Sequence, residues 1–197
     1  MSGNKVQYKK MPLEELVVLS QQNDFKALEE LIRREQKNVY AAFSYLSQQK
    51  ESVSDLTQET LLRVAKNIQN LKNPKLFKSW LNQIITNLFY DELRKSQKKP
   101  DTISLDEETE TSPPIKFQLL DKKCKPHEKC ITSELEKIIK NAILNLPDQF
   151  RIVIILRELQ GLSYEEIAQA THSNVGTVKS RIARARGKLQ EVLKTYI

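Results

Sequence analysis

The stretch LSYEEIAQATHSNVGTVKSRIARARGKL, residues 162–189, carries the clearest structural signal in the chain. Ser163 followed three residues later by Glu166 is a capping box, which predicts that a short helix begins at this point. A turn through His172 leads to Ser173, which we expect to cap a longer, basic helix. A short helix, a tight turn and a second helix form the helix-turn-helix plan, whose second helix enters the major groove of DNA.

The last helix of this plan has two chemically different faces. At 100° per residue its apolar side chains fall on one side: Val175, Val178, Ile182, Ala185, Leu189 and Val192. The opposite side carries small or hydrogen-bonding residues and cations: Thr177, Ser180, Ala183 and Arg184, flanked by Lys179, Arg181 and Lys188. Small side chains let a helix backbone approach base edges, while flanking cations reach phosphates. An ordinary solvent-exposed amphipathic helix shows similar faces, but the upstream helix and turn favour DNA binding.

Two segments of this region resemble region 4 of bacterial sigma factors of the extracytoplasmic-function (ECF) group. They are LRELQGLSYEEIA, in which Gly161 ends the preceding helix as the left-handed C′ residue, and VGTVKSRIARAR. The resemblance implies that the last helix faces the minus-35 promoter element, through Thr177, Lys179, Ser180, Arg181, Ala183 and Arg184. It also implies support from Arg157 and Tyr164 on the upstream side. Asn174 stands where the family often has proline after the cap, which affects only the strength of capping.

The charge of the chain is unevenly distributed. The net charge is +7 and the pI is near 9.3, which favours a polyanionic partner. Residues 60–99 and 172–197 are basic, whereas residues 100–136 are acidic. Chance segregation of charge is the alternative to a DNA-binding arrangement. The chain has neither the apolar run of a membrane span nor a signal-peptide pattern, so we expect a cytoplasmic protein without membrane insertion.

Helical periodicity predicts an all-α chain made of two small helical domains joined by a flexible linker. We expect sigma region 2 at 10–96, the linker at 97–128 and the region 4 helix-turn-helix at 129–195. In the first domain one helix begins near Pro12, a second spans 24–46 and a third begins at Ser54 or Asp55. Pro74 disfavours helix at the residue before it and precedes a fourth helix over 76–99. Further helices are expected at 131–146, 148–160 and 163–171.

The segment DLTQETLLRV, residues 55–64, resembles the D-x-x-Q-E-x-F signature of sigma region 2. In that family the motif docks on a coiled coil of the polymerase β′ subunit. Asp55, Gln58 and Glu59 match the motif, and Leu62 shares their helix face by its spacing. Leu61 replaces the family's aromatic residue. Acidic residues that merely suit the dipole at the start of a helix are the alternative reading.

FKSWLNQIITNLFYDELR, residues 77–94, resembles the family's next helix, with matches at Phe77, Trp80, Leu81, Asn87, Asp91 and Arg94. The resemblance implies that the preceding loop, Leu71, Lys72 and Asn73, captures a flipped minus-10 base. Asn67 and Asn87 would line the pocket. Trp80 is expected in the core rather than as a base platform. Gln83 and Thr86 stand where relatives often carry arginine, which weakens the expected grip on duplex DNA.

Cys124, His127 and Cys130 form a C-x2-H-x2-C pattern. A structural zinc site normally needs a fourth ligand, so no metal is predicted. A redox response remains an alternative to an ordinary structural role, in which Cys130 is a small core residue. The sequence offers no catalytic triad, carboxylate pair or phosphate-cradling glycine loop, so we predict neither enzymatic activity nor a cofactor.

Together the two motifs predict an alternative sigma factor that directs RNA polymerase to a restricted promoter set. The implied partners are core RNA polymerase, through its β′ coiled coil and β subunit, promoter DNA, and an anti-sigma factor covering the same surfaces. The acidic segment LDEETE would thread the polymerase channel by resemblance, although a solvated tether explains it equally well. An autonomous helix-turn-helix repressor or activator is the alternative function.

Overall fold

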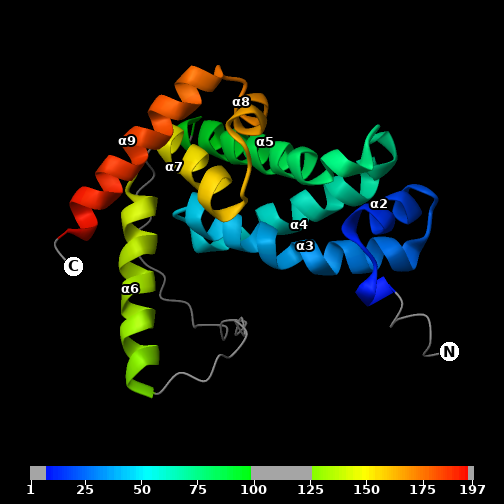
Figure 1. Cartoon of the computed structure of the whole chain (residues 1–197), viewed down its shortest axis with the longest axis horizontal. Coiled ribbons are helices and arrows are strands. Elements are labelled where there is room, and N and C mark those ends of the chain that lie inside the picture. Colours follow the sequence, from blue (N-terminus) through cyan, green and yellow to red (C-terminus); the bar gives the residue numbers. More distant parts are fainter. Residues whose placement is uncertain (1–7, 99–125, 195–197) are drawn as a thin grey trace.

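The computed structural model describes residues 8–98 and 126–194, and every regular element in these ranges is helical (Figure 1). The first half contains α2 (Leu13–Gln21), α3 (Phe25–Leu46), α4 (Lys50–Asn67), the 3₁₀ turns η1 (Ile68–Asn70) and η2 (Pro74–Leu76), and α5 (Phe77–Lys98). The second half contains α6 (Pro126–Leu144), α7 (Asp148–Ile154), the π-helical turn η3 (Ile155–Leu159), α8 (Tyr164–Ala170) and α9 (Val175–Leu193). The predicted all-α fold with two helical domains is confirmed. The expected linker falls mainly on residues 99–125, which lie outside the described part.

The first domain is built on the long antiparallel helices α3 and α4, with α2 and α5 packed beside them (Figure 1). Phe43 and Leu31 of α3 and Phe77 of α5 are almost completely buried between these helices. Burial of each such side chain contributes about 1.5–3 kcal/mol. Asp24 caps α3, because its carboxylate accepts hydrogen bonds from the backbone N–H groups of the second and third helical residues. Local capping and the apolar stripe together define this hairpin.

The start of α4 differs from the prediction. The helix begins at Lys50, whereas Ser54 or Asp55 was expected to cap it. Val53 is only 5 % exposed, so core packing extends the helix by one turn before these polar residues. The predicted break at the other end is confirmed, because Asn73 is extended and Pro74 opens the short turn η2.

The helix-turn-helix forms as the sequence predicts, apart from its second cap. Gly161 has φ +72°, and Ser163 and Glu166 form both hydrogen bonds of the capping box. Ser173 does not cap the last helix, because Asn174 occupies the N-cap position of α9. The Ser173 hydroxyl instead lies 2.7 Å from the hydroxyl of Thr171. The Ser173 side chain therefore forms a hydrogen bond within the turn instead of capping α9.

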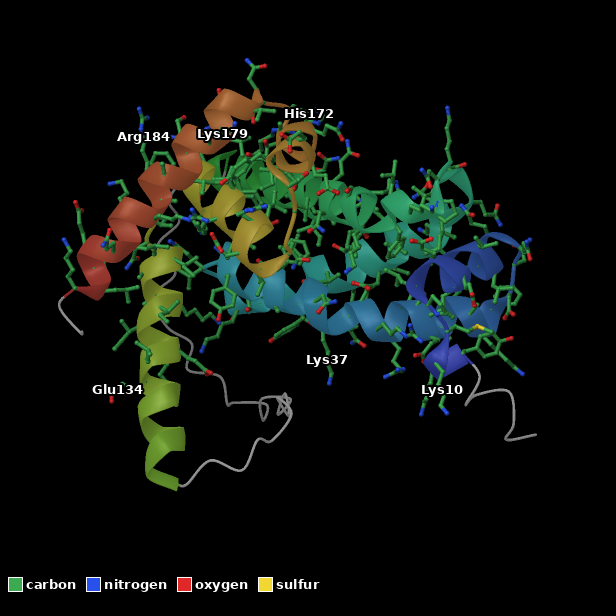
Figure 2. The ribbon with its side chains drawn as sticks, in the orientation of Figure 1. Lys10, Lys37, Glu134, His172, Lys179 and Arg184 are labelled. Carbon is green, nitrogen blue, oxygen red and sulfur yellow. The ribbon has the colours of Figure 1, made fainter. Side chains whose placement is uncertain are left out.

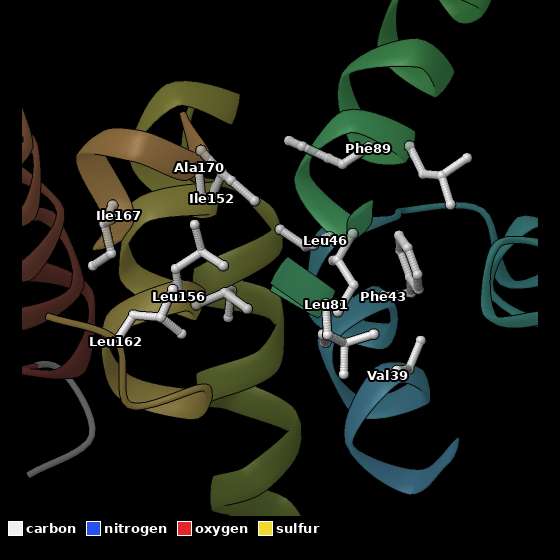
Figure 3. Packing of buried hydrophobic residues seen from close by; sticks show 14 of the residues in the cluster. Val39, Phe43, Leu46, Leu81, Phe89, Ile152, Leu156, Leu162, Ile167 and Ala170 are labelled. Carbon is white, nitrogen blue, oxygen red and sulfur yellow. The ribbon is translucent and has the colours of Figure 1, made fainter. Parts of the chain in front are cut away.

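The two helical domains pack directly against each other. α8 contacts α5, and α7 contacts α3 (Figure 1). Figure 3 shows Ile152 and Leu156 of the second domain facing Leu46 and Leu81 of the first. These side chains belong to one continuous buried cluster. α6, by contrast, stands away from the first domain along most of its length (Figure 1).

Candidate nucleic-acid interface

The basic helix α9 presents its small residues and several cations to solvent. Val178, Ile182 and Ala185 are at most 2 % exposed, and they hold the apolar face against the domain core. Lys179, Ser180, Ala183 and Arg184 are exposed, whereas Thr177 is half-buried and accepts a hydrogen bond at its carbonyl from the Ser180 hydroxyl. Arg184 points away from the body of the molecule (Figure 2). The exposed face is shaped for close approach to a polyanion.

The upstream residues Arg157 and Tyr164 form a cluster with α9. The Arg157 guanidinium lies 4.8 Å from the centroid of the Tyr164 ring, and the Lys179 ammonium lies 5.9 Å from it. Arg157 Nη1 also donates a hydrogen bond of 2.6 Å to the Leu162 carbonyl. Cation–π contact and this hydrogen bond hold the arginine in place. The predicted supporting residues therefore adjoin the basic helix.

Two other arginines of α9 are partly engaged within the protein. Arg186 donates to the carboxylate of Glu158 at 2.6 Å, in a pair with both side chains more than half exposed. Arg181 is half-buried and lies close enough to Tyr90 of α5 to affect it. Burial raises the pKa of Tyr90, and the positive charge of Arg181 opposes that rise. The predicted minus-35 residue Arg181 is therefore less exposed than Lys179 and Arg184 on the same helix.

The loop between η1 and η2 contributes both to the core and to the surface. Leu71 is only 9 % exposed, so its side chain anchors the loop. Lys72 and Asn73 are exposed, and the Asn73 side chain accepts from the backbone N–H of Lys75 at 3.1 Å. Asn73 also borders a groove of about 540 Å³ next to α2. The loop therefore offers two polar side chains to a ligand, above one apolar anchor.

The other residues predicted for the minus-10 site lie on α4 and α5. Asn67 is exposed, and its amide donates to the Arg63 carbonyl at 2.9 Å. Asn87 is exposed on α5. Trp80 is half-buried against the core, with its ring centroid 6.1 Å from that of Phe77. This position agrees with the expected packing role of the tryptophan.

The motif on α4 forms an exposed acidic face. Asp55, Gln58 and Glu59 are all exposed, and Leu62 is 52 % exposed. Glu59 accepts a hydrogen bond of 2.7 Å from Arg63 one turn later. Asp55 and Glu59 border a groove of about 620 Å³ whose other wall is α5. Leu62 therefore adds one apolar side chain to an exposed face that is otherwise polar and acidic.

Contacts between the domains were not predicted from the sequence. The Ser79 hydroxyl of α5 donates to the carboxylate of Glu166, which lowers the pKa of that carboxyl together with the capping bond from Ser163. Arg151 of α7 is buried and donates to the Leu46 carbonyl of α3 and to the carboxylate of Asp148. Its guanidinium lies 5.9 Å from the Phe89 ring centroid. An arginine within an apolar run of the sequence was the only local signal for such a role.

The pattern formed by Cys124, His127 and Cys130 falls outside the residues whose side chains the structure describes. Cys124 is outside the described residues, and the side chains of His127 and Cys130 are also not described. Among the described residues no group of three or more His, Cys, Asp or Glu side chains is arranged to hold a metal ion.

Comparison with known proteins gives the family. The model of Sigma-70 region 2 matches residues 31–99, and that of Sigma-70, region 4 matches residues 136–189. The ECF RNA polymerase sigma-E factor of Haemophilus influenzae is 33% identical over 180 residues, covering 91% of this chain and 94% of that protein. The chain belongs to the ECF sigma factors. The ECF sigma factor SigW of Bacillus subtilis is 37% identical over 142 residues, covering 71% of this chain and 74% of the relative.

Solved structures agree with this assignment. The sigma factor RpoE of Bartonella quintana, crystallised with the anti-sigma factor NepR, has a TM-score of 0.63 and 30% identity. The match covers 87% of this chain and 97% of that one. CnrH, in complex with the cytosolic domain of CnrY, has a TM-score of 0.64 at 21% identity, which supports the fold. The expected family is confirmed for this ECF sigma factor, and the alternative of an autonomous repressor or activator is not favoured.

The family matches include both helices that carry the sequence motifs. α4 lies within the region 2 match, and α8 and α9 as far as residue 189 lie within the region 4 match. No described helix of this ECF sigma factor combines the length and apolar character needed to cross a membrane.

Proposed function

We propose that this ECF sigma factor binds core RNA polymerase and directs it to a restricted set of promoters. The observation that carries the proposal is the presence, in one chain, of the exposed small and basic face of α9 and the exposed acidic face of α4. The first surface suits duplex DNA and the second suits a protein partner. A protein that only binds DNA has no need of the second surface.

The minus-35 duplex is read by α9 in this proposal. Ser180 and Ala183 allow the helix to lie close to the base edges, and Arg184 donates to a base or an adjacent phosphate. Thr177, Lys179 and Arg181 add contacts, and Arg157 and Tyr164 support the helix from the upstream side. Binding through such cations weakens as salt rises, because bound counterions are released.

The first domain supplies the contacts to polymerase and to the minus-10 element. Asp55, Gln58, Glu59 and Leu62 dock on the β′ coiled coil, while the β subunit is a second contact. Lys72 and Asn73, with Asn67 and Asn87, receive bases of the opened strand, and Leu71 fixes the loop beneath them. Preferential binding of the separated strand favours opening of the duplex, because a ligand shifts an equilibrium by the difference in its affinity for the two states. The chain itself has no catalytic role.

An anti-sigma factor is a further partner in this proposal. The Bartonella quintana relative was crystallised with such a protein, and 97% of that chain is covered by the match. We expect the anti-sigma factor to cover the polymerase-binding and DNA-binding faces, so that release activates transcription.

Reconstituted transcription tests the proposal. The purified chain is added to core polymerase and fragments of the source genome, and the RNA 5′ ends are mapped. We expect discrete transcripts that are absent with core polymerase alone. Failure to start any specific transcript would overturn the proposal. Tight DNA binding by the isolated chain that is unaffected by Glu59→Lys would instead favour an autonomous DNA-binding regulator.

A further inference from the structure

The loop between η1 and η2 is tied to α2 by a single glutamine. Gln21, the last residue of α2, donates from Nε2 to the carbonyl oxygen of Ile68 at 2.9 Å and to that of Leu71 at 2.7 Å. The donor lies 47 and 50 residues before its two acceptors in the sequence. One amide group therefore bridges the start of η1 and the first residue of the loop.

These two carbonyls lie where regular helix geometry ends. The backbone N–H of Leu71 donates to the Ile68 carbonyl at 3.2 Å, which closes the 3₁₀ turn, and the chain then becomes extended. The final carbonyl groups of a helical segment lack intrahelical partners and need others. Gln21 satisfies the Leu71 carbonyl and adds a second bond at Ile68. It thereby holds the backbone direction from which Lys72 and Asn73 emerge.

A second amide pair supports the same segment. Gln69 Nε2 donates to Asn23 Oδ1 at 2.8 Å, and Asn23 lies in the left-handed region with φ +66° at the turn between α2 and α3. On the far side of the loop, Asn73 caps η2 through Lys75. The side chain of Leu71 is buried beneath the loop. The loop is therefore held at its start by the hydrogen bonds and the burial of Leu71, and at its end by the cap from Asn73.

We propose that Gln21 is a positioning residue for base recognition by the loop at Leu71–Asn73. The inference rests on the proposed minus-10 role of this loop. A loop that is already ordered loses less conformational entropy on binding, and its side chains discriminate between bases from defined positions. Both hydrogen bonds of the Gln21 amide go to backbone carbonyls, so we expect it to act through the positions of Lys72 and Asn73 rather than by touching DNA. Its removal loosens the loop and reduces discrimination.

The first test measures loop order without DNA. Gln21→Met keeps the length of the side chain but removes the donor, and Gln36→Met is the matched control at an exposed glutamine of α3. Amide hydrogen exchange is followed in the full chain for peptides covering residues 68–73. We expect exchange to be about tenfold faster in Gln21→Met and unchanged in Gln36→Met, since two hydrogen bonds of ordinary strength are lost in the first variant only. Equal exchange in the two variants would overturn the positioning role.

The second test measures specificity in the assembled holoenzyme. Each variant with core polymerase is bound to a single-stranded oligonucleotide carrying the minus-10 sequence of a promoter that the wild type transcribes, and to a scrambled oligonucleotide. The ratio of the two affinities is insensitive to a smaller fraction of folded protein. We expect this ratio to fall about tenfold in Gln21→Met and to stay at the wild-type value in Gln36→Met.

The outcomes separate this inference from the function on which it rests. If the wild type discriminates and Gln21→Met discriminates equally well, the role of Gln21 is refuted while the loop's role stands. If the wild-type holoenzyme shows no discrimination, the minus-10 assignment of the loop fails and the inference fails with it. Gln21→Glu is a second variant of the same shape, which places a carboxylate against two carbonyl oxygens. It should lower the ratio at least as far, and an unchanged ratio would also contradict the proposal.

Discussion

Arg151 of α7 donates a hydrogen bond of 2.6 Å from Nη1 to the carbonyl oxygen of Leu46, the last residue of α3. The arginine thus caps a helix of the other domain, where unpaired carbonyls carry partial negative charge. Asp148 of its own helix pairs with the same guanidinium. Burial lowers the pKa of Arg151, and the charge of Asp148 opposes that shift. This contact and the Ser79–Glu166 hydrogen bond hold the domains together.

The direct contact between the two helical domains limits how far apart on DNA they can bind at the same time. If the proposed minus-35 and minus-10 contacts are made on one promoter, the two positions differ by about 25 base pairs, or roughly 85 Å at 3.4 Å per base pair. In the structure α8 of the helix-turn-helix contacts α5 directly. We therefore expect the domains to separate before both elements are occupied. Residues 99–125 have a maximum reach of about 90 Å, which is enough for this separation.

Arg151→Met is expected to favour the separated arrangement. It removes the charge and its bonds to Leu46 and Asp148 at similar side-chain volume, and a hydrogen bond to a charged group contributes about 1.5–3 kcal/mol. Small-angle X-ray scattering should show a larger radius of gyration. Arg63→Met, which alters an arginine paired within the first domain, is the control and should leave the radius unchanged. An unchanged radius in Arg151→Met would show that apolar packing alone keeps the domains together.

Arg184→Ala should weaken binding to the minus-35 duplex by about 1–3 kcal/mol if the guanidinium contacts a base, and should leave core binding intact. Fluorescence anisotropy with holoenzyme and a labelled duplex measures the first quantity. Arg186→Ala is the matched control, because Arg186 is paired with Glu158 and should lose less. Loss of core binding in Arg184→Ala would contradict the proposed division of roles between the domains.

Glu59→Lys should reduce affinity for core polymerase by at least about tenfold, since it reverses a charge on the exposed face of α4. Competition against a labelled wild-type chain measures this affinity. Glu51→Lys changes the same charge in the first turn of the same helix and should have little effect. Equal losses in the two variants would indicate general electrostatics rather than a specific docking face.

The stability of the first domain should depend on pH through Glu30. Hydrogen bonds from Arg33 lower the pKa of Glu30 from 4.5 to about 2. Burial of the carboxyl opposes this shift, and a hydrogen bond from Arg34 adds to it. Its carboxylate is stabilised by folding, so this contribution is present above about pH 4.5 and is lost as the pH falls toward 2. Because the Arg33 side chain is 58% exposed, solvent screening limits the loss to the order of 1 kcal/mol.

Urea unfolding of the wild type and of Glu30→Gln between pH 2 and pH 6 measures this contribution. The difference in unfolding free energy between the two proteins should shrink as the pH falls. A constant difference across the range would mean that Glu30 titrates as it does in the unfolded chain.

Features set by neighbouring residues were predictable from the sequence. The capping box at Ser163 and Glu166, the left-handed Gly161 and the break before Pro74 each depend on contacts or steric limits within a few residues. The apolar face of α9 is also local, because helical spacing alone places Val178 and Ile182 on one side. These features were enough to indicate the helix-turn-helix, whereas the family was suggested by the resemblance of LRELQGLSYEEIA, VGTVKSRIARAR and DLTQETLLRV to sigma factor motifs.

Features set by distant residues required the tertiary structure. Packing of Val53 moved the start of α4 to Lys50, and burial of Leu71 turned a presumed contact residue into an anchor. Arg151 and Leu46 are 105 residues apart in the sequence, and no periodicity or motif links such distant positions. The sequence determined which helices form and which faces are polar, because those properties follow from local spacing and capping. Only the tertiary structure decided how the domains meet and which side chain holds the loop, because these contacts exist only after the chain has folded.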